Sequence, residues 1–293
     1  MKTGNCSLSY YYALNDPEAL YKRHKELGYD TMDENLEDCS MPFYKSDEAM
    51  VEYCLKRKEA AEKYGVEIFQ VHGSYGPWSC YEDKDDTEKE IIEVHRRGLL
   101  GCKTMGSKHY VIHPVTTAGW RHDYDNATAT EMTMRILRKL VPICEDMKII
   151  VCLENLPGSG SGYTINTVEG VLSAVNEINS DYIKMCLDTG HASIQDRDVS
   201  KYVYMCGDMI KCLHVHDTNG YQDIHILPYQ GVINWDKFTT ALADTGFSGS
   251  VSSEVDTSKA EYMPDGILND YERLCFKIMK NLADETERKK ARD

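Results

Sequence analysis

Residues 148–191 read KIIVCLENLPGSGSGYTINTVEGVLSAVNEINSDYIKMCLDTGH. Two apolar segments, KIIVCLEN (148–155) and YIKMCLDTGH (182–191), flank a helical pattern over residues 166–179. Continuous apolar runs are typical of parallel strands that are covered on both faces. A helix between two such strands makes a strand–helix–strand unit. This stretch therefore predicts an α/β fold with a parallel sheet.

The same alternation continues along the rest of the chain. Further strands are expected over residues 5–10, 29–36, 66–72, 108–114, 210–217 and 249–255. Further helices are expected from Asn15 or Asp16 onward, and over residues 46–65, 85–105, 128–146, 198–207, 235–245 and 266–288. Eight strand–helix units over roughly 250 residues fit a closed (β/α)8 TIM barrel better than a doubly wound sheet. No linker divides the chain, so we expect one TIM-barrel domain over residues 1–293.

Composition narrows the classes of function. The longest apolar runs are strand-sized and the first residues lack an apolar leader segment, so we expect a cytoplasmic protein with no membrane partner. The eleven cysteines form no CxxC pair, which indicates reduced core cysteines rather than a disulfide framework. The formal net charge of −15 disfavours nucleic acid as a partner, because a phosphate backbone would be repelled.

Ionisable residues recur at one end of the expected strands. In a TIM barrel the C-terminal strand ends converge on one cavity, which holds the active site. Here those ends and the loops after them carry His72, His113, Glu154, Asp188 with His191, His214 with His216, Asp223 with His225, and Glu254. A single strand-end histidine is usually a core or capping residue, but six of the ten histidines belong to this set. Buried carboxylates need neutralising partners, and histidine–carboxylate sets bind zinc, manganese and similar ions. The pattern therefore predicts a divalent metal site at the C-terminal strand ends.

Four strings in the chain resemble the xylose isomerase-like TIM-barrel superfamily. They are LENLPG, CLDTGH, HVHD followed by DIH, and SSEV, and the similarity extends from about residue 5 to residue 280. This superfamily covers sugar and sugar-phosphate isomerases and epimerases, together with endonuclease IV of AP endonuclease family 2. In the isomerase branch, the resemblance implies one metal ion held by Glu154, Asp188, His214 and Glu254. It also implies that Glu154 and Glu254 are catalytic proton-transfer residues, and that the ion is zinc or manganese, with magnesium or cobalt as alternatives.

The endonuclease branch of the same superfamily holds three zinc ions. Its additional ligands match His72, His113, His191, Asp223 and His225. By the division in that branch, His72 and His113 would share one ion with Glu154, while His191, Asp223 and His225 would hold another. His216 is expected to point the same way as His214, as a reserve ligand or a substrate contact.

The surroundings of the expected site favour a sugar over DNA. The loops EDCSMPFYKSDE (37–48) and GSYGPWSCYEDKDD (73–86) are acidic, whereas an abasic-site nuclease needs basic loops. Aromatic residues suited to stacking on a sugar ring are Tyr75, Trp78 and Trp120, and His191 is a further expected substrate contact. Asn155 is a candidate to orient Glu154, although strand alternation alone would turn its side chain away from the cavity.

We therefore predict a divalent-metal-dependent sugar or sugar-phosphate isomerase or epimerase. It would move a proton next to a carbonyl through a metal-stabilised enediolate. Two alternatives stay open: an endonuclease IV-like zinc-dependent phosphodiesterase acting at abasic DNA, and a non-catalytic sugar-binding barrel. Homo-oligomers are common in the family, so self-association is a further expectation.

Overall fold

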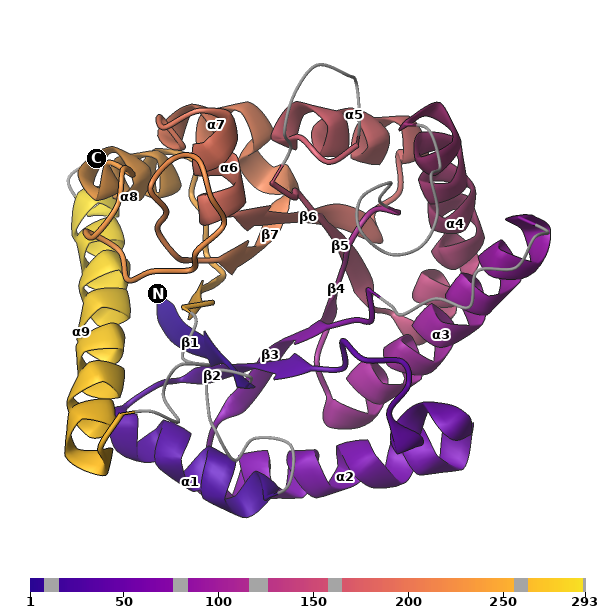
Figure 1. Cartoon of the computed structure of the whole chain (residues 1–293), viewed down its shortest axis with the longest axis horizontal. Helices are drawn as coiled ribbons and strands as arrows, with labels where there is room; N and C mark the ends of the chain where they lie inside the picture. The colour runs from indigo at the N-terminus through magenta and orange to yellow at the C-terminus, as the bar shows by residue number, and fades with distance from the viewer. Residues whose placement is uncertain (8–15, 76–83, 116–125, 158–164, 256–262, 292–293) are drawn as a thin grey trace.

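Eight parallel strands form the centre of the molecule. The computed structural model describes residues 1–7, 16–75, 84–115, 126–157, 165–255 and 263–291. The strands are β1 (Lys2–Cys6), β2 (Thr31–Asn35), β3 (Glu67–His72), β4 (His109–Ile112), β5 (Ile150–Glu154), β6 (Ile183–Asp188), β7 (Ile210–His214) and β8 (Ser250–Ser253). Their order in the sheet is β7-β6-β5-β4-β3-β2-β1-β8. A parallel bridge between Val215 and Ser253 joins the two ends, so the sheet closes into a (β/α)8 TIM barrel (Figure 1).

Helices surround this barrel, as Figure 1 shows. They are α1 (Pro17–Leu27), α2 (Asp47–Tyr64), α3 (Lys84–Met105), α4 (Asn126–Met147), α5 (Val168–Ile178), α6 (Thr189–Gln195), α7 (Ser200–Cys206), α8 (Trp235–Asp244) and α9 (Asp265–Lys290), with short 3-10 turns η2 (Pro42–Lys45) and η3 (Gly207–Met209). Their ends follow local chemistry. The Asp16 carboxylate caps α1, the Ser46 hydroxyl caps α2, and Gly65 ends α2 in the left-handed region at φ 63°.

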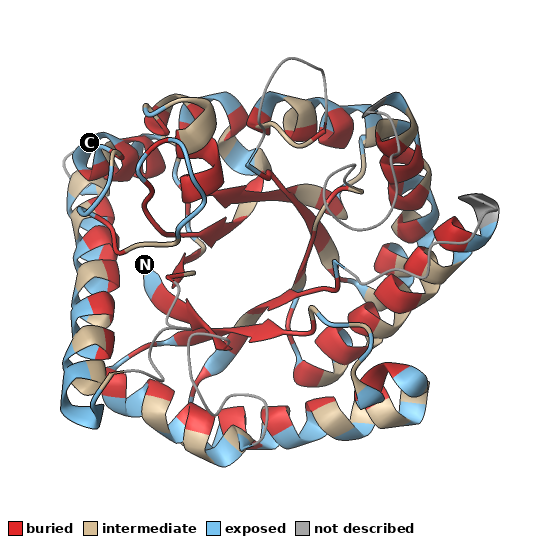
Figure 2. Ribbon diagram, viewed as in Figure 1, coloured by how far each residue is buried: buried red, intermediate tan, exposed pale blue. Residues whose placement is uncertain are grey.

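Burial follows the barrel. The strands are buried almost throughout, whereas the helices bury only the face turned toward them (Figure 2). One layer of the barrel interior consists of Val111, Cys152, Cys186 and Cys212. The ten cysteines within the described ranges form no disulfide, in line with the expectation of reduced thiols. None of the helices described is long and apolar enough to cross a membrane.

Several element boundaries differ from the sequence prediction, and two of them have a clear physical cause. The first strand covers Lys2–Cys6 rather than residues 5–10, because Lys2 to Asn5 pair with β8 across the closure of the barrel. The segment ending in DTGH was predicted as strand up to His191, but β6 ends at Asp188. The Asp188 carboxylate accepts a hydrogen bond of 2.6 Å from the His191 backbone N–H and so begins helix α6.

Candidate metal centre

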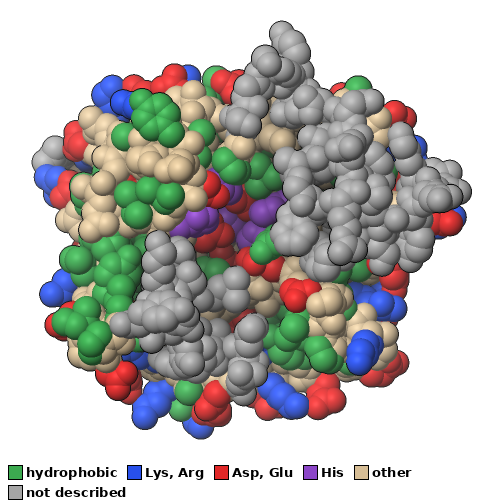
Figure 3. Space-filling view, in the orientation of Figure 1, with side chains coloured by type: hydrophobic (Ala, Val, Ile, Leu, Met, Phe, Trp, Pro, Cys, Tyr) green, Lys and Arg blue, Asp and Glu red, His purple; other side chains and the backbone are tan. Residues whose placement is uncertain are grey.

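The centre of the site is built by four consecutive strands of the barrel. Glu154 ends β5, Asp188 ends β6 and His214 ends β7, while Glu254 directly follows β8. His214 Nδ1 lies 3.1 Å from Glu154 Oε2 and 3.4 Å from Glu254 Oε1. In the space-filling view, histidine and acidic side chains gather in the hollow at the middle of this face (Figure 3). One donor atom from each of the four lies within 4.8 Å of all the others.

The arrangement of these donor atoms suits coordination of a divalent cation better than hydrogen bonding among the four side chains. Glu154 Oε2, His214 Nδ1 and Glu254 Oε2 are buried and have no hydrogen-bond partner among the described residues. Ligands about 2.1 Å from a common ion lie roughly 3.0–3.4 Å apart, which is the separation found around His214 Nδ1. Buried polar atoms that lack a partner are costly. The residues at this position therefore fit a metal ion with mixed nitrogen and oxygen ligands.

The surroundings of Glu154 and Glu254 shift the pKa values of their carboxyl groups in opposite directions. Burial and the charges of Glu154 and Asp188 raise the pKa of Glu254 to about 8, against the opposing effect of His214. Burial also acts to raise the pKa of Glu154, but His214 and His113 outweigh it and hold that pKa well below its usual range. The metal-free centre therefore favours an ionised Glu154 beside a protonated Glu254 at neutral pH.

His72 and His113 approach Glu154 from the neighbouring strands. His72 Nε2 lies 3.4 Å and His113 Nε2 lies 3.3 Å from Glu154 Oε2. The Gly73 carbonyl accepts a hydrogen bond of 2.9 Å from His72 Nδ1, so in the neutral ring Nε2 carries the lone pair. The compact group here consists of His72, Glu154 and His214, whereas the sequence expectation grouped His72 and Glu154 with His113.

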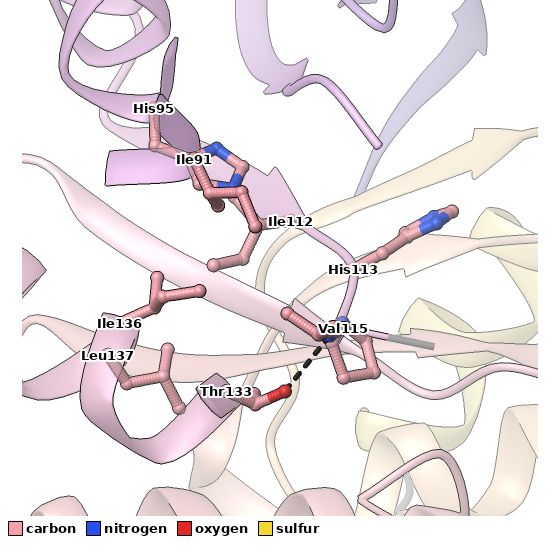
Figure 4. Close-up of a pocket in the computed structure, with 9 residues that line it drawn as sticks. Ile91, His95, Ile112, His113, Val115, Thr133, Ile136 and Leu137 are labelled. Carbon is pink, nitrogen blue, oxygen red and sulfur yellow. Dashed lines mark hydrogen bonds between the residues drawn. The ribbon is translucent and has the colours of Figure 1, made fainter. Parts of the chain in front are cut away.

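His113 also borders a small apolar pocket between α3, α4 and β4. The pocket is lined mainly by Ile91, Ile112, Ile136 and Leu137. In the close-up the His113 ring is directed away from these apolar side chains (Figure 4). The pocket therefore lies outside the metal centre, in the apolar packing between the helices and β4, and does not enlarge the polar cavity.

A second group of donors lies beside the centre. Asp223 bridges two histidines, with Oδ2 3.1 Å from His191 Nε2 and Oδ1 3.0 Å from His225 Nε2. The Glu254 carbonyl accepts a hydrogen bond of 2.8 Å from His225 Nδ1. His225 adopts a positive φ of 41°, an uncommon conformation for a residue other than glycine. The loop after β7 therefore holds this histidine against the backbone of β8.

His216 completes the second group, although the sequence suggested that it would share the orientation of His214. Its Nε2 lies 2.9 Å from Asp188 Oδ2, and its ring stacks on His225 with centroids 3.8 Å apart. The strand ends at His214, so alternation along the strand no longer controls residue 216. His216 therefore belongs to the group formed with His191, Asp223 and His225, and it also contacts Asp188 of the central group.

The remaining sequence expectations concern Asn155 and the aromatic residues Tyr75, Trp78 and Trp120. The Asn155 side chain forms two hydrogen bonds with the backbone of Asp188, at 2.9 and 3.0 Å, rather than one with the Glu154 carboxylate. As the residue after Glu154, it points to the other side of the strand. Tyr75 stacks on His113 with centroids 5.1 Å apart and stays 45% exposed. Trp78 and Trp120 lie outside the described residues.

The sequence reasoning missed two buried aspartates. Asp33 on β2 places Oδ2 3.2 Å from His214 Nε2. Asp217 accepts hydrogen bonds from the backbone N–H groups of Tyr229, Gly231, Val232 and Ile233 and from Trp235 Nε1, at 2.9 to 3.2 Å. Their positions in the sequence were the signal that could have identified them, since Asp33 lies within an expected strand and Asp217 directly follows HVH. Asp217 therefore shapes the loop that carries Asp223 and His225.

Comparison with known proteins places this site in a family. The profile of the family described as xylose isomerase-like TIM barrel matches residues 21–273. The D-psicose 3-epimerase of Ruminiclostridium cellulolyticum is 25% identical over 254 residues, covering 84% of this chain and 81% of that protein. The crystal structure of a D-tagatose 3-epimerase-like protein matches with a TM-score of 0.75 at 23% identity, covering 99% of each chain.

A zinc-containing structure has the same fold. The crystal structure of the IOLI protein with a binding zinc atom matches with a TM-score of 0.71 at 20% identity, covering 98% of each chain. The family profile spans most of this sequence, and the eight parallel strands close into the barrel that its description names. The chain belongs to the xylose isomerase-like TIM barrel family.

Proposed function

We propose that this protein is a divalent-metal-dependent sugar isomerase or epimerase. The observation that carries the proposal is the placement of two carboxylates beside one histidine. Glu154 from β5 and Glu254 from the end of β8 both lie within 3.4 Å of His214 Nδ1. A relative that matches most of the chain is named as a D-psicose 3-epimerase, which supports a ketose or a related polyol as substrate.

Glu154, Asp188, His214 and Glu254 would hold the ion. Three carboxylates and one imidazole suit zinc, manganese, cobalt or magnesium, with zinc and manganese favoured by the nitrogen ligand. A bound divalent ion supplies a Lewis acid for the substrate's carbonyl and neighbouring hydroxyl oxygens. The same charge neutralises the carboxylates, which are otherwise buried together.

The two glutamates would carry the proton. One glutamate, in its ionised form, accepts the proton from the carbon beside the carbonyl, leaving the electron pair in the substrate's enediolate, while the other glutamate is protonated and holds the proton that is returned. Return of a proton by the other glutamate to the opposite face of that carbon gives the epimer. Return to the former carbonyl carbon, with the hydroxyl proton transferred to the other oxygen, gives the isomer. His191 and the loop residues Asp223 and His225 would contact the sugar from the side of the second group.

A zinc-dependent phosphodiesterase acting at abasic DNA is the second candidate. The grouping of His191, His216, Asp223 and His225 favours it, since three donor groups would suit a trinuclear site. The formal charge of −15 opposes it. Elemental analysis of the purified protein separates the two: one ion per chain supports the isomerase arrangement, and about three zinc ions support the nuclease.

The direct test measures exchange of a substrate C–H proton. Protein loaded with zinc or manganese is incubated with D-psicose, D-tagatose and D-fructose in deuterated water, and NMR follows deuterium incorporation and new sugars. We expect Glu254→Gln and Glu154→Gln to lower the rate at least ~100-fold, the scale of general acid–base catalysis. Glu59→Gln, an exposed position on α2, is the matched control. Exchange that persists in Glu254→Gln with metal retained would contradict the assignment, as would abasic-site nicking without any exchange.

A further inference from the structure

We propose that Asp33, held by Gln70, is a positioning residue that directs Nδ1 of His214 toward the metal. The inference rests on the proposed metal-dependent function and adds a residue outside the ligand set. Asp33 belongs to β2 and His214 to β7, which lie far apart in the order of strands around the barrel. Both side chains point into the barrel, where Asp33 is 1% exposed and His214 is fully buried.

The two nitrogens of His214 face different partners. Nδ1 faces Glu154 and Glu254, whereas Nε2 lies 3.2 Å from Asp33 Oδ2. Within the described part of the chain, neither His214 Nε2 nor Asp33 Oδ1 has a partner that meets hydrogen-bond geometry. A hydrogen bond from Nε2–H to the Asp33 carboxylate would satisfy a buried donor that otherwise costs about 1–3 kcal/mol.

Gln70 fixes the aspartate from the next strand. Its Nε2 donates a hydrogen bond of 2.8 Å to Asp33 Oδ2, and the Leu213 carbonyl lies 3.4 Å from the same nitrogen. Leu213 directly precedes His214 in β7. Gln70 therefore joins the carboxylate to the strand that carries the histidine.

The Asp33 carboxylate determines which of the two neutral tautomers of His214 is favoured. Without Asp33, a neutral His214 would gain by placing its proton on Nδ1, where the oxygens of Glu154 and Glu254 accept it. That tautomer has no lone pair at Nδ1 and cannot bind the ion there. A carboxylate at Nε2 holds the proton on the far side of the ring and makes Nδ1 more basic. Asp33 thus counteracts the preference for a proton on Nδ1 of His214 that Glu154 and Glu254 would impose.

The chain provides a matched control on the same strand. Glu34 is the next residue, is also fully buried, and faces away from the barrel interior. Its carboxylate accepts a hydrogen bond of 2.7 Å from the Tyr21 hydroxyl and lies 3.2 Å from Arg57 Nε. Glu34→Gln removes a buried charge from β2 without touching His214, so it reports the cost of a structural role alone.

The test compares metal affinity with stability in the full chain. Isothermal titration with Mn²⁺ and Zn²⁺ gives the affinity of the wild type, Asp33→Asn, Asp33→Ala, Gln70→Leu and Glu34→Gln, and chemical denaturation of the metal-free proteins gives the stability. We expect roughly 10- to 100-fold weaker binding in both Asp33 variants, the usual effect of losing a partner behind a ligand histidine. Gln70→Leu should show a smaller loss, and Glu34→Gln should lose stability with unchanged affinity.

A spectroscopic readout separates positioning from packing. In ¹⁵N-histidine-labelled, metal-loaded protein, a protected His214 Nε2–H resonance is expected in the wild type and is expected to shift in Asp33→Asn. Unchanged affinity in both Asp33 variants overturns the inference, as does an equal loss in Glu34→Gln or a wild type that binds neither ion. If the wild type binds metal in an Asp33-dependent way but exchanges no sugar proton, the proposed reaction fails while the inference on Asp33 stands.

Discussion

The imidazole of His216 occupies the space next to the Cα of Gly190: a Cβ at residue 190 would lie 1.9 Å from His216 Cε1 and 2.4 Å from its Nδ1. Only glycine lets this ring reach Asp188 while it stacks on His225. The contact between His216 and Asp188 therefore depends on the glycine in the first turn of α6.

Gly190→Ala should displace His216 from Asp188. Overpacking of a filled site typically costs about 1–3 kcal/mol, and we expect a loss of that size in the free energy of unfolding, measured with denaturant. Gly266→Ala is the control, because a Cβ there meets nothing within 4 Å and the residue lies in helix α9. A Gly190→Ala protein as stable as Gly266→Ala would show that the His216 ring moves at no cost.

Removing metal should destabilise the folded protein. The buried Oε2 atoms of Glu154 and Glu254 and both ring nitrogens of His214 lack hydrogen-bond partners within the described ranges, so an ion that binds only the folded state stabilises it. At 100 times the dissociation constant the gain is about 2.7 kcal/mol, which thermal unfolding detects as a rise in Tm. His214→Asn should abolish the rise at the same ion concentration. No shift with zinc, manganese, cobalt or magnesium would contradict the proposed centre.

Asp217→Asn should loosen the loop that presents Asp223 and His225. The carboxylate of Asp217 accepts several backbone N–H groups between Tyr229 and Ile233, whereas an amide has one acceptor oxygen and turns a donor toward the others. We expect faster hydrogen–deuterium exchange over residues 218–233 and a loss of about 1–3 kcal/mol in the free energy of unfolding. Exchange confined to wild-type rates in this loop would show that other contacts hold it.

Acid should weaken the fold through His24, far from the metal centre. Burial lowers the pKa of His24 to about 4, while its Nε2–H donates a hydrogen bond of 2.7 Å to the Thr31 carbonyl. Between an unfolded pKa of about 6.5 and a folded pKa of about 4, the unfolded chain binds a proton that the folded chain does not, so stability falls as the pH falls.

The matching variant is His24→Gln, which keeps a donor for Thr31 and cannot titrate. Relative to it, the wild type should lose about 3 kcal/mol of unfolding free energy from about pH 7 to about pH 4, since each pKa unit corresponds to about 1.36 kcal/mol. Denaturant titrations at constant ionic strength and with chelator present give this difference. A difference that does not change with pH would mean that His24 titrates alike in both states.

The site shows how far strand-end chemistry can be read from a sequence. Glu154, Asp188 and His214 end three apolar segments, and parallel strands of a barrel must bring those ends together, so their proximity followed from the pattern. Asp33 was not found this way, because it lies within an expected strand rather than at its end, and nothing local shows that its side chain faces the barrel interior and reaches the site. Its partner His214 is 181 positions away along the chain, and only the closure of the barrel brings the two side chains together.

The sequence by itself determined the alternation of strands and helices, several helix caps and the ring of ionisable residues at the strand ends. These depend on side-chain periodicity and on hydrogen bonds within a few residues, as at Asp16 and Ser46. The tertiary structure decided where the first strand starts, because Lys2 pairs with Ser250 only in a closed barrel. It also decided the orientation of His216, which leaves the strand pattern after His214 and turns to Asp188 in the space next to Gly190. Contacts between residues distant in the chain fix these features, so no local pattern contains them.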